Sequence, residues 1–171
     1  MKFLTRTRIK WIAYIIELFL VAVVQSTPNL LPEFLGVKPL LLIVFAVSIA
    51  MFEGEGAGIV IGLVAGLLMD LSTSSVFGFY ALTIMIVCYA CGSLVVFLMR
   101  NNIVTAMVLA FCAVLIIGIL RWFFFFVLWG DTKMWYYLYA IMLPQLVYTT
   151  AAMPIAFYFN RSIATHLAEE E

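Results

Sequence analysis

Charged residues are scarce in this chain. Only 11% of its 171 residues are Asp, Glu, Lys or Arg, and nine acidic residues balance nine basic ones. Soluble domains carry about 25% charged residues, so the chain has too little polar surface for a sizeable soluble domain. The zero net charge gives no indication of nucleic acid as a partner. With 67% hydrophobic residues and a mean hydropathy of +1.19, the composition predicts an integral membrane protein.

Residues that commonly bind metals or carry out catalysis are equally few. The three cysteines lie inside apolar runs, where the Cys88–Cys91 spacing indicates helix packing rather than redox chemistry. The one histidine, His166, stands alone in a polar tail, so no metal site is expected. The chain has no Ser–His–Asp set and no phosphate-binding glycine loop. We therefore expect neither enzymatic activity nor a cofactor.

Long apolar runs, by contrast, fill most of the chain. Because about 20 apolar residues cross a bilayer, they predict an all-α membrane protein with six transmembrane helices. The second and third runs are short, so one kinked helix, a re-entrant hairpin and two ordinary helices all stay open. The predicted membrane domain covers 11–159, between a basic segment at 1–10 and a polar tail at 160–171. The six runs cover residues 11–26, 39–52, 57–71, 79–99, 103–128 and 134–159.

The basic residues predict the orientation in the membrane. Cytoplasmic loops of membrane proteins are enriched in Lys and Arg, and a six-span topology with a cytoplasmic N-terminus places six basic residues inside and two outside. Both termini are then cytoplasmic. The residues after the first run do not resemble a signal-peptidase site, so we expect an uncleaved first helix. The inside set is Lys2, Arg6, Arg8, Lys10, Arg100 and Arg161, and the outside set is Lys38 and Lys133.

The third run carries a stripe of glycines at every fourth position. Residues four apart lie nearly above one another on a helix, so this face is smooth and ends in a carboxylate. In lipid, small residues allow close approach of a second helix. The stripe therefore predicts a packing face, either within the protein or against a partner. Its members are Gly54, Gly58, Gly62 and Gly66, followed by Asp70.

Three ionisable residues lie within the apolar runs. Each is costly at membrane depth, so each needs a partner or a route to the surface. We expect Glu17 to make a polar contact with a neighbouring helix or partner protein, or else to be a surface acid that snorkels or is protonated. Asp70 and Arg121 share one depth, so they are a candidate charge pair. Alternatively, Arg121 is an interfacial anchor beside the aromatic residues that follow it.

Several stretches, taken in order, resemble the rod shape-determining MreD family. A short loop leads through Gly36 to Pro39 and a second apolar helix, and the glycine stripe then runs into Asp70. Gly78 and Leu82 follow at the positions typical of the family. These motifs cover residues 36–82, a little over a quarter of the chain. The family commonly has Asp directly after the proline, where this chain has Leu40, so any role of that carboxylate is in doubt here.

The resemblance implies a non-catalytic scaffold subunit of the bacterial elongation (Rod) complex, which supports cell shape and side-wall peptidoglycan synthesis. The implied partners are MreC, the polymerase RodA, a class B penicillin-binding transpeptidase, the actin-like MreB and membrane lipid, at the cytoplasmic (inner) membrane. The family is also similar in helix arrangement to the substrate-binding subunits of energy-coupling-factor vitamin transporters. The alternative function is therefore such a binding subunit, with Trp129, Asp131, Trp135, Tyr136, Tyr137 and Tyr139 available to line an outer pocket.

Overall fold

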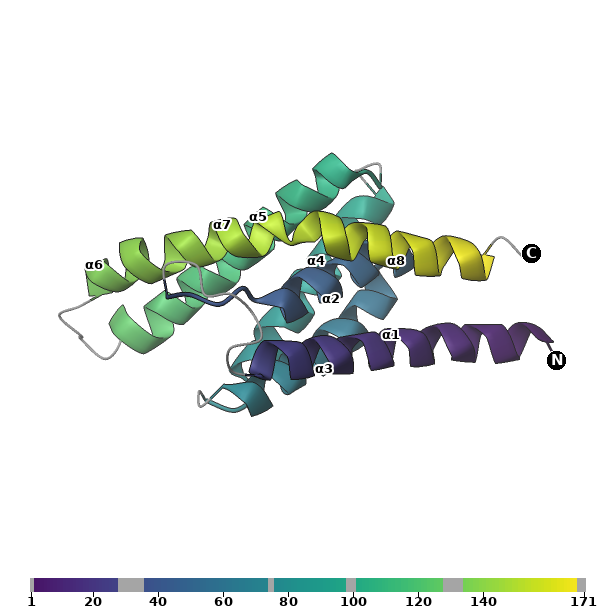
Figure 1. The fold of residues 1–171 in the computed structure, drawn as a ribbon, viewed down its shortest axis with the longest axis horizontal. Coiled ribbons are helices and arrows are strands. Elements are labelled where there is room, and N and C mark those ends of the chain that lie inside the picture. Colours follow the sequence, from purple (N-terminus) through teal and green to yellow (C-terminus); the bar gives the residue numbers. More distant parts are fainter. Residues whose placement is uncertain (1, 28–35, 74–75, 98–100, 128–133, 169–171) are drawn as a thin grey trace.

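A computed structural model describes residues 2–27, 36–73, 76–97, 101–127 and 134–168, and these are almost entirely helical (Figure 1). Both ends of the chain lie at the same end of the bundle, which we call the near end; the opposite end is the far end. In chain order the elements are α1 (Lys2–Ser26), α2 (Leu41–Glu53), α3 (Glu55–Ser72), α4 (Phe79–Phe97), α5 (Ile103–Trp122), the π-helical turn η1 (Phe123–Val127), α6 (Met134–Tyr137), the π-helical turn η2 (Leu138–Met142), α7 (Leu143–Ala151) and α8 (Met153–Ala168).

The centre of the bundle is α2, which contacts α1, α3, α4, α5 and α8. A helix that is apolar all round is stable only when it is surrounded, and the α2 side chains from Leu42 to Val44 and from Ala46 to Met51 are all buried. The other helices bury one face each and expose apolar side chains on the other. Such an exposed apolar surface is typical of helices that contact lipid.

Within the described residues, five helical stretches are long and apolar enough to cross a membrane, and α2 is a shorter apolar helix. The second and third runs are separate helices, so the alternative of one kinked helix is wrong. They meet at Gly54, whose φ of +85° is a conformation that favours glycine. At 13 residues α2 is about 20 Å long, too short to span alone. The non-helical segment 36–40 precedes it and extends its path toward the far end (Figure 1).

At the near end two helices continue beyond the apolar runs, into the basic segment and the polar tail. α1 begins at Lys2, so most of the basic segment 1–10 is helical, and α8 continues to Ala168 in the polar tail. The last apolar run is interrupted near both of its prolines. Pro144 follows η2 at the start of α7, and Pro154 stands in the first turn of α8, where its missing N–H leaves no helical bond unmade.

Candidate functional site

The glycine face of α3 packs against α4 inside the protein. A Cβ atom added at Gly58 would lie 2.7 Å from the carbonyl oxygen of Cys88, and one at Gly62 would lie 2.8 Å from the Cα of Met85. At Gly66 the added atom would lie 2.6 Å from the carbonyl oxygen of Tyr80. Each step of four along α3 matches a step of about four back along α4, so the two helices form an antiparallel pair in close backbone contact. We call this contact the glycine seam.

Two further glycines lie beside the near end of the glycine seam. Gly54 is not on the packing face itself but at the α2–α3 junction, where its positive φ joins the helices. Gly92 of α4 abuts that junction, since an added Cβ would lie 2.9 Å from the carbonyl carbon and oxygen of Gly54. Gly56, by contrast, has open space around it. Glycine is thus sterically required at some positions of this segment and not at others.

Asp70 ends the seam by capping the next helix. Its Oδ2 accepts hydrogen bonds from the backbone N–H groups of Gly78 and Ala81, both at 3.0 Å, and its Oδ1 accepts from Tyr80 N–H at 3.1 Å. The first N–H groups of a helix have no partner within the helix and carry the positive end of its dipole. A buried carboxylate is therefore stabilised there, and the carboxylate in turn fixes the start of α4 against the end of α3.

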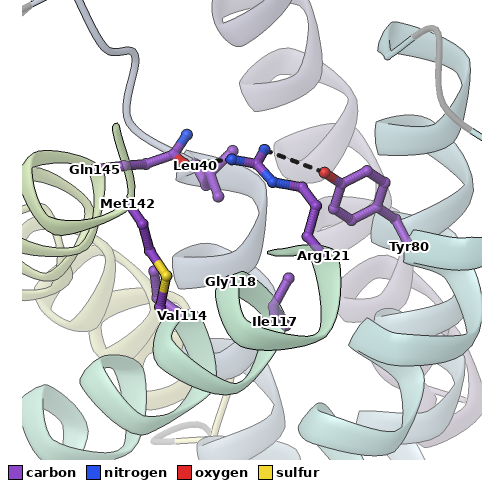
Figure 2. A pocket seen from close by; sticks show the side chains of 8 residues that line it. All are labelled: Leu40, Tyr80, Val114, Ile117, Gly118, Arg121, Met142 and Gln145. Carbon is purple, nitrogen blue, oxygen red and sulfur yellow. Dashed lines mark hydrogen bonds between the residues drawn. The ribbon is translucent and has the colours of Figure 1, made fainter. Parts of the chain in front are cut away.

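Arg121 lies at the far end but does not bond with Asp70. Its Nη1 donates to the Tyr80 hydroxyl at 3.3 Å, and its Nη2 donates to Oε1 of Gln145 at 3.1 Å (Figure 2). The guanidinium also lies over the ring of Tyr137, 5.2 Å from the centroid, a cation–π distance. The direct charge pair expected from shared depth is therefore wrong. Tyr80 joins the two residues instead, through its N–H to Asp70 and its hydroxyl to Arg121.

The same polar cluster holds the non-helical entry to α2. Nε2 of Gln145 donates to the carbonyl oxygen of Lys38 at 3.2 Å, and Leu40 N–H donates to Oγ1 of Thr149 at 3.1 Å. Leu42 N–H donates to Oε1 of Gln25 at 3.0 Å. The intervening Pro39 is buried and has no N–H to satisfy. Non-helical backbone at membrane depth needs such partners, because lipid offers none.

A small cavity adjoins Arg121 in this cluster. It is bordered by side chains of α4, α5, η2 and α7 and of the segment before α2, and its volume is about 10 Å³. That is roughly the space needed for one water molecule. Of the residues proposed for a transporter pocket, Tyr137 makes the cation–π contact with Arg121, while Tyr136 and Tyr139 are exposed. Trp129 and Asp131 lie outside the described residues. The cavity lining comprises Leu40, Tyr80, Val114, Ile117, Gly118, Arg121, Met142 and Gln145 (Figure 2).

Glu17 is buried in the middle of the bundle, with only 6% of its surface exposed. Asn160 of α8 lies close to it, although among the described residues neither side chain makes a hydrogen bond of good geometry. The expectation of a surface acid is therefore wrong, and a polar neighbour on another helix is present. Nearer the termini, Glu53 binds Lys10 at 2.6 Å and accepts a hydrogen bond from the Tyr14 hydroxyl at 2.9 Å. This contact joins α1 to the end of α2.

The described residues contain no group of three or more His, Cys, Asp or Glu side chains that could hold a metal ion. Cys88 and Cys91 are buried and form no disulfide within the described residues, and Cys88 packs beside Gly58 and Gly62. The side chain of His166 lies outside the described part of the chain.

A family model for the rod shape-determining protein MreD matches residues 5–163. The chain belongs to the MreD family. The match includes residues from every described helix, from α1 to α8, so it extends well beyond the motifs recognised in the sequence. Searches of curated proteins and of solved structures gave no match. The comparisons therefore lend no support to the expected similarity to energy-coupling-factor subunits.

The MreD-type motifs have physical roles in this structure. The glycines of α3 allow the backbone of α4 to approach closely, and Asp70 caps the start of α4. Gly78 adopts the positive φ of +96° just before α4. At Leu40, where the family commonly has Asp, the backbone N–H bonds to Thr149 and the side chain borders the small cavity. Four contributors escaped the sequence analysis: Gln25, Tyr80, Gln145 and Thr149. Their signal was an amide or hydroxyl inside an apolar run, which is unfavourable in lipid without a partner.

Proposed function

We propose that this MreD-family protein is a non-catalytic scaffold subunit of the bacterial elongation complex, and that it binds MreC in the cytoplasmic membrane. Family membership supports a role in determining rod shape. RodA, the class B transpeptidase and MreB are then partners reached directly or through MreC. With both termini cytoplasmic, the near end faces the cytoplasm and the far end faces outward.

The observation that carries this proposal is that the polar side chains at the far end form hydrogen bonds within the protein. Asp70, Arg121, Gln145 and Thr149 all bond to other parts of the same chain. They hold helices in place and enclose a cavity of only about 10 Å³. Small-molecule sites have volumes of about 300–1,000 Å³, so this polar cluster is too small to capture a vitamin. A rigid bundle with lipid-facing helices is suited to binding other membrane proteins through its surface.

Purification from native membranes tests the proposal. The chain, tagged after Glu171, is extracted from a rod-shaped host in mild detergent, and co-purifying proteins are quantified by mass spectrometry. A tagged multi-pass protein of the same membrane, expressed at the same level, is the control. We expect enrichment of MreC and of peptidoglycan-synthesis proteins over that control. Recovery of a transporter ATPase module without MreC would support the alternative function instead.

A further inference from the structure

A groove opens on the surface between α4 and α5, with a volume of about 350 Å³. These helices follow one another in sequence, yet α4 packs mainly on α3 while α5 packs on α2, α7 and α8. Figure 1 shows α5 running beside the rod formed by α6 to α8. The two helices therefore diverge, and side chains of both line the space between them. The lining comprises Gly78, Phe79, Leu82, Thr83, Ile86 and Val87 of the α4 side, and Ile116, Leu120 and Phe124 of the α5 side.

The groove presents hydrocarbon and no free polar group. Thr83 is the one polar side chain in the lining, and its hydroxyl already donates to the carbonyl oxygen of Phe79 at 2.7 Å. Leu82, Ile86 and Ile116 are all exposed, so the walls that they form face outward into the bilayer. An occupant therefore needs to be apolar along its whole length in the groove.

The length of the groove matches one leaflet of a membrane. From Gly78 to Val87 along α4 it extends roughly 13 Å, and from Ile116 to Phe124 along α5 roughly 12 Å, at 1.5 Å per residue. The hydrocarbon of one leaflet is about 15 Å thick, half of the bilayer core. The groove occupies the far half of the bundle, because α4 begins and α5 ends there.

An aromatic contact closes the far end of the groove. The Phe79 ring meets the Phe124 ring edge-on at 5.7 Å between centroids, and the Phe125 ring at 5.5 Å. These contacts join the start of α4 to η1. A transmembrane helix of a partner is about 10–12 Å wide and continues through both leaflets, whereas this groove is about one leaflet long and closed at its far end. A single hydrocarbon chain is narrow and ends within a leaflet.

We propose that this groove binds one acyl chain of a phospholipid from the far leaflet, with the chain lying between α4 and α5. Because the Phe79–Phe124 contact closes the far end, the chain enters sideways past Leu82 and Ile116, and its headgroup lies at the far surface outside that contact. A lipid held there fills a space that would otherwise lose packing contacts on both walls. The proposal concerns a lipid site and is independent of whether MreC is the protein partner.

Site-mapped photolabelling tests this directly. The full chain is reconstituted in nanodiscs of phosphatidylethanolamine and phosphatidylglycerol, with a small fraction of phospholipid carrying a diazirine in its acyl chain. After irradiation, adducts are mapped by mass spectrometry. We expect labelling concentrated at Leu82, Ile86 and Ile116, several-fold above Ile119, which faces lipid on the same helix but does not line the groove. Equal labelling of Ile116 and Ile119 in the unsubstituted protein would overturn the proposal.

A matched pair of substitutions provides a second arm. Ile116→Trp fills the groove, whereas Ile119→Trp adds the same bulk outside it, and the two side chains are similarly exposed at 46% and 44%. We expect Ile116→Trp to reduce labelling of Leu82 and Ile86 several-fold and Ile119→Trp to leave it unchanged. A photoreactive phenylalanine at position 116, irradiated in living cells, shows whether a lipid or a partner protein occupies the groove. A protein cross-link there, in place of a lipid adduct, would show that a partner helix fills the groove.

Discussion

Asp70 fixes the junction between α3 and α4 through three backbone hydrogen bonds. A carboxylate suits this place because both of its oxygens accept and its charge complements the helix dipole. Asp70 is almost fully buried, so water cannot take its place as the hydrogen-bond acceptor for these N–H groups. One side chain thus determines where α4 begins.

Asp70→Asn is expected to destabilise the protein. The amide keeps one accepting oxygen but turns an NH₂ donor toward N–H groups and removes the charge, at a cost of about 1–3 kcal/mol. Thermal unfolding of the full chain in detergent, followed by tryptophan fluorescence, measures the loss. An unchanged unfolding temperature would mean that the capping bonds contribute nothing to stability.

The hydrogen bond between Arg121 and Tyr80 is expected to contribute to the stability of the protein. Tyr80→Phe removes the hydroxyl acceptor, and Arg121→Gln removes the cation, so each lowers stability. Because they remove the same hydrogen bond, the double mutant should lose less than the sum of the singles, by about 1 kcal/mol. A double-mutant cycle in the same unfolding assay gives this coupling. Strictly additive losses would place the two side chains out of contact.

The pairing of Arg121 illustrates what the sequence could not predict. Counting residues gave its depth, which matches that of Asp70, but depth does not give the direction in which a side chain points. Asp70 points toward α4, where backbone N–H groups compete for it, and Arg121 points toward α4 and α7. Gln145 was detectable as an amide in an apolar run. Its two partners, Arg121 and Lys38, depend on a tertiary arrangement that no local pattern encodes.

At the scale of helices, the glycine seam is the feature that the sequence predicted best. A period of four within an apolar run has few explanations besides close helix contact. The sequence did not show whether the contact lies within the chain, and the structure places it against α4. It also did not distinguish Gly54, which serves the α2–α3 junction, or identify Gly92 on the opposite helix. Both depend on a turn geometry that the spacing does not report.

Two alanine substitutions on α3 are expected to have different effects. Gly66→Ala places a Cβ 2.6 Å from the Tyr80 carbonyl oxygen, so α4 must move, and overpacking of this kind costs about 1–3 kcal/mol. Gly56→Ala enters open space on the same helix and is expected to be neutral or stabilising by up to about 1 kcal/mol. Thermal unfolding of both variants provides the comparison. Equal stability of the two would contradict a tight seam.

The short helix α2 was the weakest part of the sequence prediction. Thirteen residues suit a buried helix as well as part of a span, and length alone cannot separate them. The structure combines both, because α2 is surrounded by other helices and continues into a non-helical segment held by Gln145, Thr149 and Gln25. Only tertiary partners make such a segment stable at membrane depth.

At the scale of the whole molecule, the orientation in the membrane remains a prediction. α1 begins and α8 ends at the near end (Figure 1), so Lys10, in the first half of α1, and Arg161, in the second half of α8, belong to the near half, where positive residues favour the cytoplasm. A fluorescent protein fused after Glu171 should therefore be bright in the cytoplasm. A membrane-impermeant maleimide should label Thr73→Cys, at the far end of α3, from outside intact cells. Labelling of that cysteine only after lysis would reverse the topology.

The central claim is that this MreD-family protein acts by binding MreC rather than by chemistry or transport. Direct binding in a defined bilayer tests it most closely. The purified full chain and MreC, labelled with different fluorophores, are incorporated into the same phospholipid vesicles, and energy transfer is measured as MreC is titrated. We predict saturable transfer that unlabelled MreC abolishes by competition. Transfer no greater than that between MreC and an unrelated multi-pass protein at the same density would contradict the account.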